Sequence, residues 1–473
     1  MLLIIPPAQI QSPGLHPSLG YLAGALKAAS HQVRVIDFVN DPERCEERLD
    51  AALASIRPDI AGVYVTSMTI RTAAGIVVRV RELSNPKLIV AGGPHPSIDP
   101  AGLLHDVPGL DAAVAGEGEA AIVELCDAAA GKKELGDIAG IAFRSSGDIV
   151  RTLQRAPVSD LDSLPLPDYS CFDTSGLIPS IGYPLVTSRG CTHCCSYCAV
   201  PVLGRYRARD VRKVAGELFW AMEKYQTSRF VVVDDAFSDD IARAKIFCDL
   251  LLESGKNTKW YAMNLRADKV DAELLGKMKA SGCDTVTFGV ESGDADVLRK
   301  TRKGETLEDI ERGAALAKSA GLRVFGYFIV GLPHSSFASE MKSLAFAQRV
   351  GFDLVFFWNF LPLPGTAAAK WVENNGRMLM DYKDAVLLGH GVQPVFETDE
   401  FSRQQRIDAY CICNIKSGQC SQLLPKSLNK WQRRVKTFVL HWKYDRAALA
   451  ALAALFVKRR FWLLASVCAK RAK

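Results

Sequence analysis

Four cysteines lie within eight positions of the stretch "SRGCTHCCSYC", residues 188–198. Thiolates are nucleophiles and soft metal ligands, so such a group can form a disulfide, a redox couple, a zinc site or an iron–sulfur site. A structural zinc site usually draws two well-separated ligand pairs, and these cysteines are too crowded for it. The C-x3-C-x2-C spacing of Cys191, Cys195 and Cys198 instead supplies three thiolates that can hold a [4Fe–4S] cluster and leave one iron without a protein ligand. We predict such a cluster, with Cys194 either a packed free thiol or a substitute in an alternative C-x2-C-x3-C spacing.

The composition is that of a globular protein with reduced thiols. The chain has 473 residues, of which 48% are hydrophobic and 23% charged, enough for two or three domains with well-filled cores. The opening "MLLIIPP" has no basic segment before its apolar run, and the run stops at Pro6. These features predict a buried strand rather than a signal peptide, and therefore a cytoplasmic chain. Cytoplasmic thiols stay reduced, which argues against a disulfide framework.

The elements that must position the cysteines are short apolar runs separated by helical stretches. Five runs lie in the first 150 residues, at 2–5, 33–38, 60–67, 88–93 and 112–119. They are apolar throughout, as expected for strands buried on both faces of a parallel sheet, and their carboxyl ends would form a ligand crevice. We predict a Rossmann-like, doubly wound parallel sheet over residues 1–150 that binds a large, flat ligand. No G-x-G-x-x-G opens the first helix, which argues against a dinucleotide.

A Pro- and Asp-rich linker, residues 151–180, leads to a second domain. Six more strand candidates follow, each with room for a helix after it, at 184–190, 229–235, 259–266, 285–292, 323–333 and 353–365. Repeated βα units of this number form an open, partial (β/α)6 barrel whose chemistry lies at the strand carboxyl ends. We therefore predict an α/β chain with such a barrel over residues 181–395 and a helical, basic C-terminal region over residues 396–473. The cysteines would lie in the loop after the first barrel strand.

The cysteine stretch resembles the radical SAM superfamily, whose C-x3-C-x2-C loop follows the first barrel strand. Tyr197 stands at the aromatic position just before the last cysteine, as is usual in that superfamily. The resemblance implies that the free iron binds S-adenosylmethionine (SAM). Electron transfer from the cluster would then cleave SAM to a 5′-deoxyadenosyl radical, which abstracts a hydrogen atom from the substrate. An external electron donor such as flavodoxin or ferredoxin is implied as a partner.

Other barrel strand ends match the superfamily less sharply and imply contacts to SAM. Asp234, in "DDAF", takes the second-strand position, where a backbone turn meets the substrate amino group. Arg266 ends the third strand and is placed to pair with the methionyl carboxylate by a forked contact. Glu291, in "GVESG", stands where ribose hydroxyls would be accepted. Gly331 and Pro333, in "FIVGLP", match the segment that lies along the adenine.

The first domain resembles the cobalamin-binding domain found in one branch of that superfamily. The resemblance is carried by "GGPHPS" (92–97), "GEGE" (116–119) and the linker stretch "LPLPDY" (164–169), while "VTS" (65–67) would place hydroxyls beside the nucleotide tail. The residues implied to bind cobalamin are Thr66, Ser67, Gly92, Gly93, Gly116, Glu117 and Gly118. The D-x-H-x-x-G signature that supplies a histidine to cobalt is missing, so no ligand from that motif is expected. A methylthiotransferase-type domain would need three cysteines for a second cluster, and this domain has two.

Together these resemblances imply a cobalamin-dependent radical SAM enzyme of the class B methylase type. It would be a C-methyltransferase acting on an unactivated carbon with SAM, methylcobalamin and a [4Fe–4S] cluster. One SAM methylates cob(I)alamin, a second supplies the radical, and methylcobalamin delivers the methyl group, because such a carbon is no nucleophile and cannot attack a sulfonium directly. The alternatives are a radical SAM cyclase, oxidase or carbon-insertion enzyme of the same family without net methyl transfer, or a non-catalytic cobalamin or redox sensor.

The last fifty residues, 424–473, are strongly basic. They carry 13 Lys and Arg against one acid, a net charge of +12, whereas the whole chain is +6. Their uncharged runs, 447–457 and 461–469, fall short of the roughly 20 residues that span a bilayer. A basic helix with tryptophans can lie in the membrane interface or pack on the barrel, and a nucleic-acid partner is less favoured. The interfacial interpretation implies a peripheral position on the inner face of the membrane and a lipid or other membrane-borne substrate.

Overall fold

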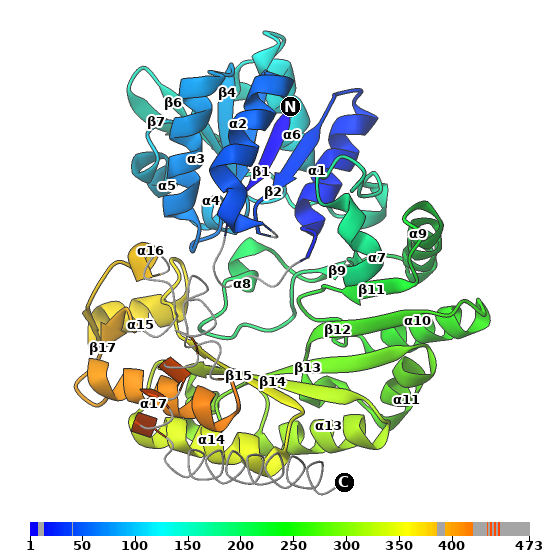
Figure 1. Ribbon diagram of the computed structural model, residues 1–473, viewed down its shortest axis with the longest axis vertical. Helices are drawn as coiled ribbons and strands as arrows, with labels where there is room; N and C mark the ends of the chain where they lie inside the picture. The colour runs from blue at the N-terminus through cyan, green and yellow to red at the C-terminus, as the bar shows by residue number, and fades with distance from the viewer. Residues whose placement is uncertain are drawn as a thin grey trace, which may run out of the picture.

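A computed structural model of the chain has two α/β domains, one above the other (Figure 1). The structure describes residues 1–7, 14–39, 41–385 and 393–419, together with residues 433, 436, 437, 439, 440, 443 and 444. Every cysteine within these ranges is a free thiol. In the same part of the chain, none of the helices combines the length and the apolar character needed to cross a membrane.

The first domain contains a seven-stranded sheet in the order β2-β1-β3-β4-β5-β6-β7. Its strands are β1 (Leu2–Ile5), β2 (Arg34–Asp37), β3 (Ile60–Tyr64), β4 (Leu88–Gly92), β5 (Ala112–Val114), β6 (Ile141–Ser145) and β7 (Asp148–Arg151). The first five are parallel and confirm the predicted sheet, whereas β6 and β7 form an antiparallel hairpin that the sequence analysis did not predict. The hairpin strands mix polar and apolar residues and lie at the edge of the sheet, so they give no purely apolar run.

Helices cover both faces of this sheet, as a doubly wound fold requires. They are α1 (Pro17–Ala28), α2 (Cys45–Ile56), α3 (Ile70–Leu83), α4 (Pro94–Ile98), α5 (Pro100–Asp106) and α6 (Glu119–Ala129). Successive side chains of β1 point to opposite faces: Leu3 and Ile5 pack with α1 and α6, and Leu2 and Ile4 pack with α2 and α3. Burial on both faces explains why the strand sequences are apolar throughout.

The second domain contains six parallel strands in the order β15-β14-β13-β12-β11-β8. They are β8 (Tyr183–Leu185), β11 (Arg229–Val232), β12 (Lys259–Leu265), β13 (Cys283–Glu291), β14 (Arg323–Val330) and β15 (Leu354–Asn359). The first and last strands do not pair, so the barrel stays open. All six predicted barrel strands are confirmed.

Helices precede, connect and follow the barrel strands, and several of their starts are encoded in the sequence. The helices are α7 (Ile178–Ile181), α9 (Val211–Lys224), α10 (Ile241–Glu253), α11 (Ala272–Ala280), α12 (Ala295–Lys300), α13 (Leu307–Ser319), α14 (Phe337–Val350), α15 (Ala367–Asn375), α16 (Tyr382–Ala385) and α17 (Arg403–Lys416). Asp210, Asp240 and Asp271 accept hydrogen bonds from the first turns of α9, α10 and α11. Thr306 and Ser336 begin α13 and α14 with capping boxes. These caps satisfy amide groups that helices leave unpaired.

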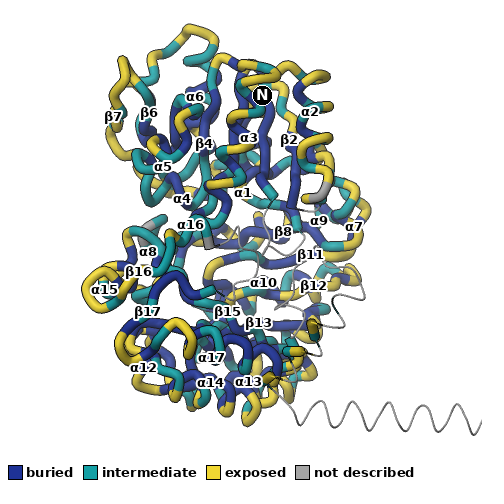
Figure 2. The backbone as a smooth tube through the Cα atoms, turned by 60° about the vertical axis from the view of Figure 1, so that its left-hand side comes forward, coloured by how far each residue is buried: buried dark blue, intermediate teal, exposed yellow. Residues whose placement is uncertain are grey.

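Two short antiparallel strands lie where the domains meet (Figure 1). They are β9 (Ser188–Arg189) and β10 (Arg207–Ala208), and α8 (Val200–Leu203) lies between them in the chain. A second small sheet pairs β16 (Arg377–Met378) with β17 (Phe396–Glu397). Figure 2 shows that the central strands of both domains are buried and that exposed residues gather on the outer helices, on loops and on the edge strand β7. The predicted basic helix over 424–473 lies largely outside the described residues.

Candidate active site at the facing strand ends

The cysteine loop leaves β9 through a glycine that the backbone requires. Gly190 has a φ of +80°, and a Cβ at this position would lie 2.5 Å from the carbonyl oxygen of Arg205. Cys191 then forms an isolated parallel bridge with Arg205. Because only glycine adopts this backbone conformation readily and leaves room for the carbonyl group, Gly190 sets the direction in which the loop departs.

Three of the four cysteines in the loop lie together. Cys191, Cys195 and Cys198 are half-buried, whereas Cys194 is exposed. Burial raises the pKa of Cys198 to about 11, and the neighbouring thiols of Cys195 and Cys191 add to the rise. Among the described residues, no three His, Cys, Asp or Glu side chains converge on a position for a single metal ion. Three neighbouring thiols are the donor set that a [4Fe–4S] cluster requires, because each thiolate binds a different iron. We call Cys191, Cys195 and Cys198 the cluster cysteines.

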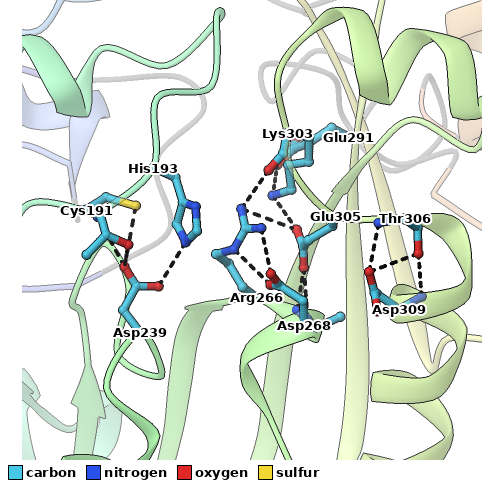
Figure 3. Close-up of polar contacts among 12 residues, drawn as sticks. Cys191, His193, Asp239, Arg266, Asp268, Glu291, Lys303, Glu305, Thr306 and Asp309 are labelled. Atoms are coloured by element: carbon cyan, nitrogen blue, oxygen red, sulfur yellow. Dashed lines mark hydrogen bonds and ion pairs between the residues drawn. The ribbon is translucent and has the colours of Figure 1, made fainter.

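Asp239 holds the start of this loop. Its carboxylate accepts hydrogen bonds from the Thr192 amide at 3.2 Å and the Thr192 hydroxyl at 2.6 Å. The same carboxylate lies 4.0 Å from the Cys191 sulfur and 3.4 Å from His193 Nε2 (Figure 3). Its own side chain is 2% exposed, whereas Thr192 lies at the surface. The sequence analysis missed Asp239, although the acidic stretch "DDAFSDD" after the second barrel strand was a signal for it.

The predicted SAM-binding residues Arg266 and Glu291 lie on the other side of the loop, with Lys303 between them (Figure 3). Arg266 directs its guanidinium fork at Asp268, with an Nε–Oδ1 distance of 2.9 Å and an Nη2–Oδ2 distance of 3.1 Å. Lys303 Nζ lies 3.4 Å from Glu291 Oε1 and 3.2 Å from Glu305 Oε2. Burial lowers the pKa of Lys303, but the carboxylates of Glu291 and Glu305 outweigh it and raise that pKa.

The structure therefore changes the roles expected of Arg266 and Lys303 at the predicted SAM site. The fork that the sequence analysis assigned to the methionyl carboxylate is held by Asp268, so that contact of Arg266 stays a prediction. The buried ammonium of Lys303 is a second cation beside it, and its side chain is 7% exposed. Lys303 lies in the loop between α12 and α13, so inspection of strand ends alone could not identify it.

Two adjacent aspartates follow β11 and serve different purposes. Asp234 is buried and accepts hydrogen bonds from the Thr187 amide at 2.7 Å and the Ser188 hydroxyl at 2.7 Å. Asp235 accepts a hydrogen bond from the Gly190 amide at 3.1 Å and lines the cavity between the domains. The Asp234 side chain thus fixes the chain between β8 and β9, and the predicted contact of its turn with SAM stays a prediction.

Gly331 and Pro333 are buried behind the end of β14. The Gly331 amide donates to Glu340 Oε1 at 2.9 Å, and its carbonyl oxygen accepts from Arg406 Nη1 at 3.1 Å. Gly331 has a φ of +84°, and a Cβ there would lie 2.3 Å from Arg406 Nη1, so glycine is required. Tyr197 packs on the small apolar cluster at the ends of β14 and β15, and burial raises its pKa well above the ordinary value. The adenine contacts of this segment stay predictions.

A cavity of about 1470 Å³, part of it open to solvent, lies between the domains at the carboxyl ends of β3, β4 and β5. It brings together the predicted cobalamin residues Gly92, Gly93, Gly116, Glu117 and Gly118 with Arg189, Gly190, Arg207 and Asp235 of the second domain.

A Cβ added at Gly92 or Gly116 would meet nothing within 4 Å, so the space beside both is open to a ligand. At Gly93, with a φ of +114°, a Cβ would lie 2.9 Å from the Val65 carbonyl oxygen. Gly93 is therefore required by the backbone itself.

The hydroxyls of Thr66 and Ser67 bind protein groups in this structure. Thr66 Oγ1 lies 3.2 Å from Thr69 Oγ1, and Ser67 Oγ lies 3.0 Å from His95 Nδ1. Ser67 and His95 are both buried. These contacts hold the loop after β3 against α4, and the predicted contact of the two hydroxyls with a nucleotide tail stays a prediction. His95, being bound inside the domain, is a structural residue.

Glu117 joins the two domains. Its carboxylate accepts from Arg189 Nη1 at 2.8 Å, from Arg207 Nη1 at 2.9 Å and from the Val158 amide at 2.6 Å. Burial raises the pKa of Glu117, but the hydrogen bonds from Arg207, Arg189 and Val158 outweigh it and hold that pKa below its ordinary value. Arg189 also pairs with Glu119 at 2.6 Å. Because protein donors occupy the carboxylate, only the backbone of Glu117 remains available for the predicted contact with cobalamin, and that contact stays a prediction.

Two family models match the chain, one on each domain. The model described as "Radical SAM superfamily" matches residues 185–347, and the model described as "B12 binding domain" matches residues 8–126. The first match covers β11, β12, β13 and β14 and contains all three cluster cysteines. The second covers four of the five parallel strands, β2 to β5, and the glycine loops that line the cavity.

Individual relatives extend over most of the chain. A protein named as an uncharacterized methyltransferase, from Pyrococcus horikoshii, is 26% identical over 417 residues, 86% of this chain and 89% of that protein. The anaerobic magnesium-protoporphyrin IX monomethyl ester cyclase of Rubrivivax gelatinosus is 27% identical over 361 residues, 73% of this chain and 64% of that protein. The structure of the radical S-adenosylmethionine methyltransferase TsrM from Kitasatospora setae matches with a TM-score of 0.67 at 19% identity, covering 80% of this chain and 78% of that one. At that identity the likeness concerns the fold, and it confirms the predicted α/β architecture.

Proposed function

Because the chain belongs to the cobalamin-dependent branch of the radical SAM superfamily, we propose that it is a methyltransferase acting on an unactivated carbon. The cofactors of this branch are the predicted ones: a [4Fe–4S] cluster, SAM and cobalamin. The Pyrococcus horikoshii relative and TsrM are both named methyltransferases, and TsrM has been solved with cobalamin and a [4Fe–4S] cluster bound. These names support methyl transfer as the net reaction.

One observation carries the proposal: the two sets of strand ends face each other across the cavity. Gly92 and Gly116 of the first domain lie on one side, and Gly190 and Asp235 of the second lie on the other. Gly190 immediately precedes Cys191, so the cavity opens beside the start of the cysteine loop. A corrinoid held at the first sheet would therefore lie next to the SAM site of the barrel, as a reaction that uses both cofactors requires.

The protein positions reactive groups and keeps water away from them. When bound, the cluster and SAM supply a radical that activates the substrate carbon, and cobalamin supplies the methyl group. The cluster cysteines would hold three irons of the cluster and would leave the fourth without a protein ligand and free for SAM. Lys303 and Arg266 provide buried positive charge for the methionyl carboxylate, and Glu291 provides an acceptor beside them. Apolar residues of the first sheet, such as Leu3 and Val90, line part of the cavity and limit the access of water there.

The test is anaerobic incubation of the reconstituted protein with deuteromethyl SAM, a reductant and cell extract. We expect a product that carries the deuterated methyl group, found by mass spectrometry as a difference from unlabelled SAM. Protein with Cys198→Ala is the control, because it retains the first domain but lacks a cluster ligand. Cleavage of SAM to 5′-deoxyadenosine without any labelled product would contradict methyl transfer.

A second candidate is a radical cyclisation without net methyl transfer. It is favoured by the relative from Rubrivivax gelatinosus, which is named a cyclase and is 27% identical over 73% of this chain. The same incubation separates the two functions. A cyclase would consume a substrate and cleave SAM, but its product would contain no deuterium from the methyl group.

We further propose a peripheral membrane contact through the basic tail, residues 424–473. The support is its charge of +12 and its two apolar runs, since anionic lipid attracts each nearby Lys or Arg by about 1 kcal/mol. The substrate would then be a lipid or another membrane-borne molecule, and flavodoxin or ferredoxin would supply the electron. Flotation with anionic liposomes tests the contact, comparing the full chain with a truncation after Lys426 at low and high salt. Equal flotation of the two proteins, or none by the full chain, would contradict it.

A further inference from the structure

The loop that follows β5 touches both the cobalamin cavity and the second domain. Gly116, Glu117 and Gly118 line the cavity. Gly116 has a φ of +87°, and a Cβ at Gly118 would lie 3.2 Å from Leu22 Cδ2. The backbone of this loop therefore packs closely on Leu22 at Gly118 and borders open space at Gly116, and the Glu117 side chain between the two glycines reaches the second domain.

That side chain is bound by two arginines from paired strands. Arg189 of β9 and Arg207 of β10 are register partners, and both donate to Glu117. Arg189 also donates to Glu119 at 2.6 Å, and its guanidinium lies 4.9 Å from the Tyr21 ring centre. We call Glu117, Glu119, Arg189 and Arg207 the interdomain ion network. Charge-assisted hydrogen bonds of this kind have a defined direction, so they fix geometry as well as adding stability.

The network is connected directly to the cluster loop. Arg189 is separated from Cys191 by Gly190 alone, and that glycine is packed against the backbone of Arg205. Cys191 bridges to Arg205, two residues before Arg207. A short path of bonded and tightly packed atoms therefore leads from the cobalamin loop through Glu117 and Arg189 to the first cluster cysteine.

We propose that Glu117 is a positioning residue that sets the distance between the corrinoid and the iron–sulfur cluster. Its carboxylate oxygens are occupied by four protein donors, from Arg189, Arg207 and Val158, so it acts through these residues and not by touching a cofactor. A reaction that uses two cofactors depends steeply on their separation, because a misplacement of about 1 Å can cost roughly a hundredfold in rate. This inference rests on the proposed function only in requiring that both cofactors bind.

A plainer interpretation is that the network only adds to the stability of the interface. The two interpretations differ in what happens when the charge is removed from a protein that still folds. Loss of stability alone lowers the unfolding temperature and leaves the geometry of the folded protein unchanged. Loss of positioning makes the corrinoid-to-cluster distance variable while both cofactors remain bound.

The test uses magnetic coupling between the two metal centres. The holoenzyme is prepared with cob(II)alamin and a reduced [4Fe–4S] cluster, and the dipolar splitting between them is measured by pulsed EPR. In Glu117→Gln the amide presents N–H groups to the arginine donors, so the side chain no longer holds both arginines. We expect the wild type to give a resolved splitting and Glu117→Gln to lose it, at unchanged iron and corrinoid content.

Glu124→Gln is the matched control. Glu124 is also a half-buried glutamate of the first domain in ion pairs, at 2.5 Å from Arg155 and 3.5 Å from Lys133, but it has no partner in the barrel. This variant should keep the wild-type splitting. Should Glu117→Gln fail to fold, Arg207→Gln removes one of the two arginines and should broaden the splitting. The proposal would be overturned if Glu117→Gln or Arg207→Gln kept the wild-type splitting, or if Glu124→Gln lost it. It would also be overturned if the wild-type protein did not bind both cofactors. None of these readouts depends on methyl transfer.

Discussion

Glu340 is a buried acid that supports the end of β14, and its titration should be visible in the stability of the protein. It is 2% exposed and accepts the Gly331 amide at 2.9 Å. Burial raises the pKa of Glu340 to about 7, despite the hydrogen bond from Gly331 and the positive charge of Arg406. Glu340→Gln keeps an acceptor for the Gly331 amide and removes the titration.

The size and sign of the effect follow from the two pKa values. The unfolded glutamate loses its proton near 4.5 and the folded one near 7, so the folded state holds the extra proton between these values. Stability linked to Glu340 is therefore fully present below about pH 4.5 and is lost as the pH rises through 7. At 1.36 kcal/mol per pH unit, the difference amounts to about 3 kcal/mol by pH 8. Glu340→Gln should escape this loss.

The assay is thermal unfolding of the two holoproteins from pH 5.5 to 8.5, followed by circular dichroism. We expect the unfolding temperature of Glu340→Gln to rise relative to the wild type with increasing pH, reaching a gap of roughly 3–6 °C at pH 8.5. Glu311→Gln is the control, because Glu311 is an exposed glutamate on α13 that pairs with Arg349. A gap that does not change with pH, or a variant less stable than the wild type at pH 8.5, would show that the buried acid is not protonated in the way described.

Replacing any one of the three cluster cysteines by alanine should remove about four irons per chain and the brown absorbance, whereas Cys194→Ala should keep both, as iron analysis will show. The assignment fails if Cys194→Ala loses the cluster and Cys195→Ala keeps it. Gly93→Val should abolish retention of cobalamin through gel filtration, because its Cβ meets the Val65 carbonyl oxygen, while Gly136→Val, at an exposed position with an unstrained φ and open space, should retain it. Lys303→Met should weaken SAM binding about tenfold or more in equilibrium dialysis, since a charge-assisted hydrogen bond contributes about 1.5–3 kcal/mol. The control Lys300→Met changes an exposed lysine and should bind SAM like the wild type. If Lys303→Met and Lys300→Met bound SAM with equal affinity, Lys303 would not belong to the SAM site.

Much of the architecture is determined by local sequence. Strands β1, β3 and β4 are recognisable because a strand buried on both faces must be apolar throughout. The barrel strands are recognisable as regularly spaced runs rich in apolar residues, although β12 and β14 alternate between buried and more exposed positions. The cysteine loop is recognisable because a cluster needs three thiolates at short, defined spacing. The glycines at 92, 93 and 116 are recognisable as strand-end turns beside a ligand. Each of these features depends on residues close together in the chain.

The tertiary structure decided which side chains of these loops and strand ends bind protein partners and which remain available for a cofactor. Asp268 holds the fork of Arg266, and Lys303, reached through a loop between two helices, lies beside it. Glu117 belongs to a loop that sequence alone assigned to a cofactor, yet it binds arginines 72 and 90 residues further along the chain. The physical reason is common to these cases. A charged side chain takes whichever partner the fold brings within about 3 Å, and that partner is set by the packing of distant elements, which no local pattern records.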